Sequence, residues 1–193
     1  MTSESILGHS VTLELLLADA AAQRALLTAK FAEMAGVINA SRGDWSTEQA
    51  QVFRLTNQLT IFREVTYQGR HMTRSFMAQK ERIFYWTIDE FLKWEPAARR
   101  PTAYFHDAWH VHQYLTNGPA PNKQKVLIDR EQEAMAEQLK VARVLRCDQG
   151  MIDWLTAYAN DRERIKERLG SGVGMNALTD GPAAIEEHFL ILD

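Results

Sequence analysis

Two histidines one helical turn apart are the residues of this sequence best suited to binding a metal ion. They are His106 and His110, the ends of a His-Asp-Ala-Trp-His segment at positions 106–110. Residues four apart share one face of a helix, and two neutral imidazoles so placed can converge on one Zn²⁺ at about 2.0–2.1 Å. Asp107, beside His106, could hold a water at such an ion or deprotonate it. On a helical wheel His112 points away from the pair, so we expect it to lie outside the site.

A third ligand is predicted on the next helix, expected over Lys123–Arg146. On its helical wheel, Glu131 lies at the centre of the apolar face, whereas Glu133 and Glu137 fall on the polar side. The apolar residues within about 80° of Glu131 are Leu127, Ile128, Ala134, Met135, Leu139, Ala142 and Leu145. Gln138 lies on the same face and could support a ligand by a hydrogen bond.

A carboxylate buried at that position needs a positive partner, because an unpaired buried charge costs several kcal/mol. Two partners fit the sequence. One is a metal ion shared with the two histidines, and the other is an arginine, with Arg70, Arg74 and Arg100 as candidates.

The helix that carries the histidines has a predicted start and end. Pro96–Pro101 breaks the preceding structure, and the helix starts at Pro101 or Thr102. Asn117-Gly118-Pro119 ends it, with glycine at the position after the last helical residue and proline behind it. Its apolar residues cover most of its circumference, and Gln113 falls on the narrow side that carries the histidines. We therefore expect this helix to lie in the core.

Further helices are expected on both sides of this one. Helix-forming residues and caps predict helices over Ser10–Asn39, Thr47–Gln58, Gln149–Ala159 and Arg162–Leu169, with Ser46 and Asp148 as N-caps.

The fold class depends on the segment before the motif. Thr60–Tyr67 and Arg82–Ile88 are rich in β-branched and aromatic residues, which favour strands. A mostly helical α+β domain with a small antiparallel sheet preceding the motif helix is our prediction. A single long helix from Thr47 to Trp86, within an all-α helical bundle, is the alternative.

The domain prediction is one domain over residues 1–169. A Gly-rich joint over residues 170–182 follows, and residues 183–193 form a C-terminal tail that could dock on this chain or on a partner.

Composition narrows the function classes. The 193 residues are 46% hydrophobic and 24% charged, and the net charge is −3. A basic footprint for nucleic acid and a cationic membrane-surface helix are both missing, so we expect neither partner. Cys147 is the single cysteine, which excludes a cysteine-based zinc site. Together with an N-terminus without a basic signal region, it favours the cytoplasm.

The motif with its downstream glutamate resembles the zincin metallopeptidases of the gluzincin type, over about Arg82–Ala142. Their motif is His-Glu-x-x-His, and here Asp107 stands where they have glutamate. The resemblance implies a zinc ion held by His106, His110 and Glu131, with Asp107 as the base and a peptide or protein as substrate. An aspartate carboxylate lies roughly 1–1.5 Å nearer the backbone than a glutamate carboxylate, and general-base geometry is tight, at about 2.6–3.2 Å.

Three other interpretations stay open. His71 with His106 and Asp107 faintly resembles the all-helical metal-dependent phosphohydrolases. Glu64 and His71 could join Asp107, His110 and Glu131 in a dimetal site of a helix bundle. The third interpretation is a helical binding or scaffold protein in which the His/Asp cluster is not catalytic.

Overall fold

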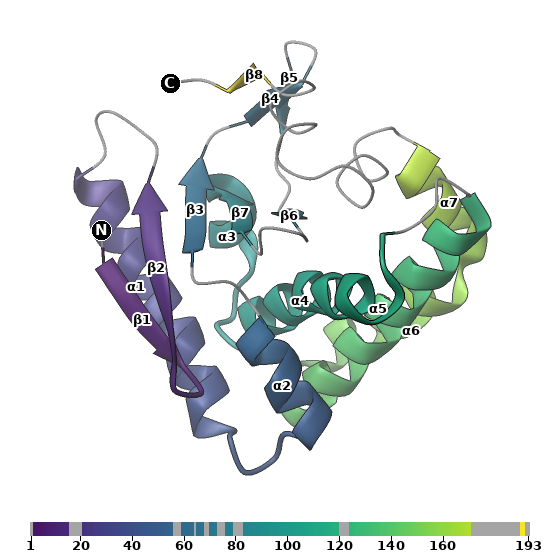
Figure 1. The fold of residues 1–193 in the computed structure, drawn as a ribbon, viewed down its shortest axis with the longest axis horizontal. Coiled ribbons are helices and arrows are strands. Elements are labelled where there is room, and N and C mark those ends of the chain that lie inside the picture. The colour runs from purple at the N-terminus through teal and green to yellow at the C-terminus, as the bar shows by residue number, and fades with distance from the viewer. Residues whose placement is uncertain are drawn as a thin grey trace.

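The computed structural model describes residues 2–15, 21–55, 59–63, 65–67, 70–72, 76–78, 83–119, 124–170 and 190–191 (Figure 1). The elements in order are β1 (Thr2–Ile6), β2 (His9–Leu15), α1 (Ala21–Ala40), α2 (Thr47–Leu55), β3 (Leu59–Arg63), β4 (Val65–Tyr67), β5 (Arg70–Met72), β6 (Phe76–Ala78), β7 (Ile83–Thr87), α3 (Ile88–Lys93), α4 (Arg99–Asn117), α5 (Gln124–Val144), α6 (Gln149–Asn160), α7 (Arg162–Gly170) and β8 (Leu190–Ile191). The fold is mostly helical α+β, which confirms the predicted class.

The principal sheet precedes the motif helix, as expected, but it is mixed rather than purely antiparallel. Its strand order is β1-β2-β3-β7-β6. The two edge pairs, β1–β2 and β6–β7, are antiparallel, whereas β2–β3 and β3–β7 are parallel. The β2–β3 pair is parallel because α1 and α2 connect its strands, and parallel strands need such a long crossover. The strands of the β3–β7 pair are connected through the segment that carries β4, β5 and β6. A small second sheet, β5-β4-β8, is antiparallel.

The all-α alternative is wrong, since β3 to β7 occupy the region that a single long helix would have filled. The β-branched and aromatic residues of β3 and β7 pair in parallel register, with Thr60 beside Phe84 and Phe62 beside Trp86. Such side chains fit a pleated sheet better than a helix.

An N-terminal hairpin replaces the start of the helix predicted over Ser10–Asn39, since residues 10–15 lie in β2 and α1 begins at Ala21. Val11 and Leu13 are buried while Ser10 is exposed, so the segment alternates with the period of a strand. Leu7 and Gly8 form the two-residue turn and both have positive φ, 51° and 82°, as a type I′ hairpin turn requires. Asn39 at the end of α1 holds this hairpin, because its Oδ1 accepts from the Leu7 N–H at 2.7 Å and its Nδ2 donates to Ser5 O at 2.7 Å.

Three of the other predicted helix ends are confirmed, whereas α4 begins at Arg99 rather than at Pro101 or Thr102. The N–H of Gln49 donates to Ser46 Oγ at 3.1 Å, and Gln49 Oε1 accepts from the Ser46 N–H at 3.0 Å, which is a capping box. Asp148 accepts from the Met151 N–H at the start of α6. Gly118 follows α4 with φ of 71°.

Helix α4 lies at the centre of the molecule. It packs against α1, α2 and α5, and in Figure 1 it lies between the sheet and the α5–α7 layer. At its N-terminal end the fully buried Arg100 donates to Phe91 O at 3.1 Å and pairs with Glu33 and Glu95. These contacts anchor α4 to α1 and to the segment around α3. The side of α4 that carries the two histidines, its polar stripe, faces α5.

The C-terminal tail is described only at β8, which pairs with β4 of the same chain. The Gly-rich joint lies outside the described residues apart from Gly170, so the predicted division into domain, joint and tail stays a prediction. None of the helices in the described ranges is long and apolar enough to cross a membrane.

Candidate metal centre

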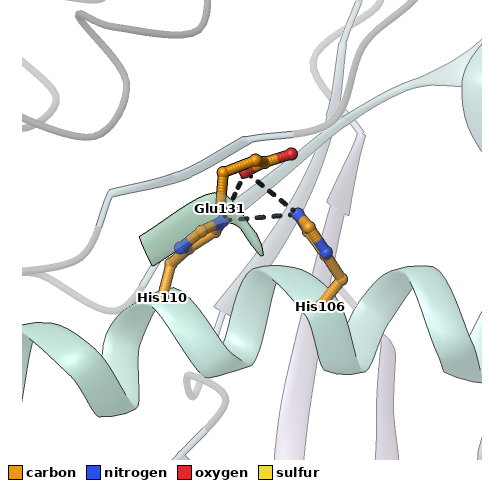
Figure 2. A group of neighbouring side chains, drawn as sticks. All are labelled: His106, His110 and Glu131. Carbon is orange, nitrogen blue, oxygen red and sulfur yellow. Dashed lines mark hydrogen bonds and ion pairs between the residues drawn. The ribbon is translucent and has the colours of Figure 1, made fainter. Parts of the chain in front are cut away.

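Three potential metal ligands converge between α4 and α5. Nε2 of His110 lies 3.3 Å from Nε2 of His106 and 3.2 Å from Oε2 of Glu131. Nε2 of His106 lies 3.6 Å from the same carboxylate oxygen. Figure 2 shows the three side chains pointing toward one another, with the two imidazoles rising from one helix and the carboxylate of Glu131, a residue of α5, above them. All three residues predicted as ligands are thus brought together.

The distances between these atoms match one face of a tetrahedron around zinc. Ligands at about 2.0–2.1 Å from a tetrahedral ion are about 3.3–3.4 Å from one another. The three observed edges, 3.2, 3.3 and 3.6 Å, lie around that value. An octahedral ion at the same bond length would bring neighbouring ligands to about 2.8–3.0 Å. The arrangement therefore fits a tetrahedral ion better than an octahedral one.

The site is buried, with 7% of His106, 6% of His110 and 4% of Glu131 exposed. The helical periodicity places both histidines on the side of α4 that faces α5. On α5, Glu131 replaces an apolar residue at the centre of the buried face, between Leu127 and Met135. The wheel therefore identified the buried carboxylate correctly, whereas Glu133 is exposed.

The charges and hydrogen bonds around His110 favour its positively charged form. Burial alone lowers the pKa of His110 and is the largest single influence on it. The hydrogen bond to Glu131, the charges of Glu131 and Asp107, and the bond to Gln113 together outweigh burial, so the pKa of His110 is raised. The same anionic surroundings that retain a proton on His110 would attract a metal cation in its place.

Gln113 lies on the polar side of α4, as the wheel indicated, and its amide joins the two helices. Its Oε1 lies 2.9 Å from Nδ1 of His110. Its Nε2 donates to Arg130 O and to Glu133 Oε2, both at 2.9 Å. This connection was missed at the sequence level, because nothing in the one-dimensional pattern pairs Gln113 with residues 17 and 20 positions away.

Asp107 lies at the edge of the centre and does not belong to the converging group. It is half-buried on α4, and its charge contributes to the raised pKa of His110. Its carboxylate is therefore within electrostatic reach of the ligands, and its role as a base stays a prediction.

An arginine partner for Glu131 is not found at Arg100, whose guanidinium is occupied by Phe91, Glu33 and Glu95. Arg74 and the side chain of Arg70 lie outside the described residues. Gln138, predicted as a supporting residue, is buried and donates to Thr102 Oγ1 at 3.3 Å. It thus bridges α5 and α4 further along the same interface.

The structure places the other two histidines considered from the sequence on α4 and on β5. His112 lies outside the centre, as expected, with its ring 4.8 Å from that of Trp109 and its Nε2 3.8 Å from Glu48. His71 belongs to strand β5, which removes the helical scaffold that the phosphohydrolase and dimetal interpretations require. Glu64 lies outside the described residues.

Comparison with known proteins finds no relative. No protein-family model matches the chain, and no curated protein and no solved structure matches it. The resemblance to gluzincins thus depends on the five-residue motif and the buried His106–His110–Glu131 cluster alone.

Proposed function

We propose that the protein is a zinc-dependent hydrolase whose metal is held by His106, His110 and Glu131. The observation that carries this proposal is the nearly equilateral triangle of Nε2, Nε2 and Oε2, with edges of 3.2–3.6 Å. Two histidines and a glutamate are a catalytic zinc ligand set, which keeps one coordination position open, whereas structural zinc sites use four protein ligands.

The donor types support zinc over the hard cations. Imidazole suits zinc, copper, iron and nickel, whereas magnesium and calcium prefer oxygen ligands. A bound zinc ion would supply Lewis acidity and an acidified water at this position. The chain itself supplies the negative charge of Glu131, which offsets part of the charge of the cation in a buried environment.

Asp107 is the residue proposed to accept a proton during the reaction. It follows His106 directly, is half-buried, and its charge already acts on His110. A peptide or protein substrate is proposed from the resemblance to gluzincins, whose reaction is attack of water on an amide carbonyl.

A peptidase assay with matched variants tests this function. The zinc-loaded protein is incubated with a mixture of quenched fluorescent peptides, and the chelator-treated protein serves as the blank. We expect cleavage by the zinc-loaded chain, and a loss of about 10²–10⁴-fold in Asp107→Asn, the usual contribution of a general base, with zinc content unchanged.

His112→Ala is the control, because His112 lies on the same helix but outside the metal centre. It should retain both zinc and activity. Zinc bound without any cleavage would instead indicate the alternative function, a binding or scaffold protein with a non-catalytic metal or His/Asp cluster.

A further inference from the structure

The orientation of the Gln113 side chain follows from its neighbours. One end of its amide faces two oxygens, the Arg130 carbonyl and a Glu133 carboxylate oxygen, each at 2.9 Å. Both oxygens only accept hydrogen bonds. The NH₂ group must therefore be at this end, since the flipped amide would set three oxygens against one another.

The other end of the amide is then an acceptor, and it faces Nδ1 of His110 at 2.9 Å. A neutral imidazole carries its hydrogen on one nitrogen and a lone pair on the other. An acceptor at this distance is satisfied only when the hydrogen is on Nδ1. The lone pair is then on Nε2, which can accept from the Nε2–H of His106 at 3.3 Å. The carboxylate of Glu131, 3.2 Å from the same Nε2, is the acceptor that competes with Gln113 for the single proton of neutral His110.

We propose that Gln113 is a positioning residue that holds neutral His110 in its Nδ1–H tautomer, and so presents the Nε2 lone pair to the metal. This role rests on the proposed metal centre. Gln113 does not touch the metal position; it acts through His110. Hydrogen bonds of this kind to ligating histidines fix both the tautomer and the ring orientation.

Burial makes this hydrogen bond effective. Gln113 is 1% exposed, so water does not compete for its Oε1. The two bonds that its NH₂ group donates hold the amide against rotation. One of their acceptors belongs to Arg130, the residue before Glu131, so the same amide also sets the α5 backbone beside the third ligand.

The two histidines differ in this respect. Within the described part of the chain, Nδ1 of His106 is buried and has no hydrogen-bond partner. Gln113 therefore supports one ligand and not the other. A change at Gln113 should alter the tautomer of His110 and leave His106 as an internal reference.

Nuclear magnetic resonance of ¹⁵N-histidine-labelled protein tests the proposal. Spectra of the metal-free chain are recorded over a series of increasing pH values, and the tautomer is determined where the His110 signals no longer change with pH. We expect the long-range ¹⁵N–¹H pattern of an Nδ1–H imidazole for His110. An Nε2–H pattern in the wild type overturns the proposal without any variant.

Two variants separate positioning from packing. Gln113→Leu should lose the Nδ1–H preference and weaken zinc binding by about 10–100-fold, the usual effect of removing such support. Gln138→Leu removes another buried glutamine that bridges α4 and α5, through Thr102, and should keep the wild-type tautomer and nearly the wild-type affinity. An unchanged His110 tautomer in Gln113→Leu, or an equal loss of affinity in both variants, contradicts the proposal.

The same samples distinguish a failure of Gln113 from a failure of the metal centre. Wild-type protein that takes up no zinc contradicts the proposed function, while its metal-free spectrum still decides the His110 tautomer. Wild-type protein that binds zinc with His110 in the Nε2–H form before loading keeps the metal centre and removes the role of Gln113.

Discussion

The Oε2 atom of Glu131 lies 3.2 Å from Nε2 of His110, although the two residues are 21 positions apart on different helices. This contact exists only because α4 packs against α5 with the polar stripe of one helix opposite the single buried carboxylate of the other. The candidate centre is therefore a property of the helix pair, and anything that binds there should stabilise the packing of the two helices.

Zinc should raise the thermal stability of the wild-type chain. A ligand at a concentration 100 times its dissociation constant stabilises the native state by about 2.7 kcal/mol, which for a chain of this size corresponds to about 5–11 °C in Tm. Differential scanning calorimetry with zinc and with chelator measures the shift. It should vanish in His106→Ala and persist in His112→Ala, and a shift of equal size in both would assign the zinc to another place.

Glu131→Gln should abolish tight zinc binding while leaving the metal-free fold nearly intact. The neutral amide keeps the shape of the side chain, and His110 can lose its proton when the carboxylate charge is gone. We expect zinc affinity to fall by more than about 100-fold, beyond the effect of losing a supporting residue, and the free energy of unfolding to change by less than about 2 kcal/mol. Titration calorimetry and urea unfolding measure the two quantities.

Glu137→Gln is the matched control for that substitution, because Glu137 lies on the same helix and pairs with Lys140 at the surface. Its zinc affinity should equal that of the wild type. Similar losses in both variants would show that the charge of α5, rather than coordination by Glu131, attracts the ion.

The metal-free protein and the zinc complex should respond to pH in opposite directions. The pKa of folded His110 is raised above its unfolded value of about 6.5. Its contribution to stability is therefore complete below about pH 6.5 and is lost as pH rises through the raised folded pKa. Zinc needs the deprotonated imidazole, so its affinity should increase over the same interval.

Urea unfolding at a series of pH values, with chelator and with zinc, measures both trends. His110→Gln should remove the loss of metal-free stability above neutral pH. A zinc affinity that is constant across the interval in the wild type would mean that His110 is not a ligand.

Arg100→Met should destabilise the fold without changing the metal stoichiometry. Arg100 is fully buried and donates to Phe91 O, and a buried carbonyl left without a donor costs about 1–3 kcal/mol. Arg99→Met is the control, because the neighbouring Arg99 pairs with Asp148 at the surface, where ion pairs contribute little. Urea unfolding compares the two variants. A loss of zinc in Arg100→Met after refolding would connect this arginine to the metal centre.

Much of the centre could be predicted from the sequence, because helical periodicity alone places His106, His110 and Glu131. The spacing of the histidines puts them on one face, and the apolar neighbours of Glu131 mark it as buried. The support from Gln113 could not be predicted, since it depends on which turn of α5 lies against α4. That register is set by packing between helices and not by any local pattern.

The N-terminal hairpin is a second feature that could not be predicted from the sequence. Leu7 has a positive φ in the turn, which is uncommon for residues other than glycine and asparagine. The turn therefore lacks the Asn-Gly or Asp-Gly sequence that usually predicts a type I′ hairpin. The good helix formers further along then extended the predicted helix too far toward the N-terminus. The parallel pairing of β2, β3 and β7 was also missed, because it joins strands that are far apart in the chain.

Metal content measures the central claim most directly. The wild-type protein and the His106→Ala/His110→Ala variant are purified without chelator, incubated with equimolar zinc, desalted and analysed by inductively coupled plasma mass spectrometry. The proposed centre predicts about one zinc per wild-type chain and background zinc in the double variant, with both proteins folded by circular dichroism. Background zinc in the wild type, or equal zinc in both proteins, would contradict it.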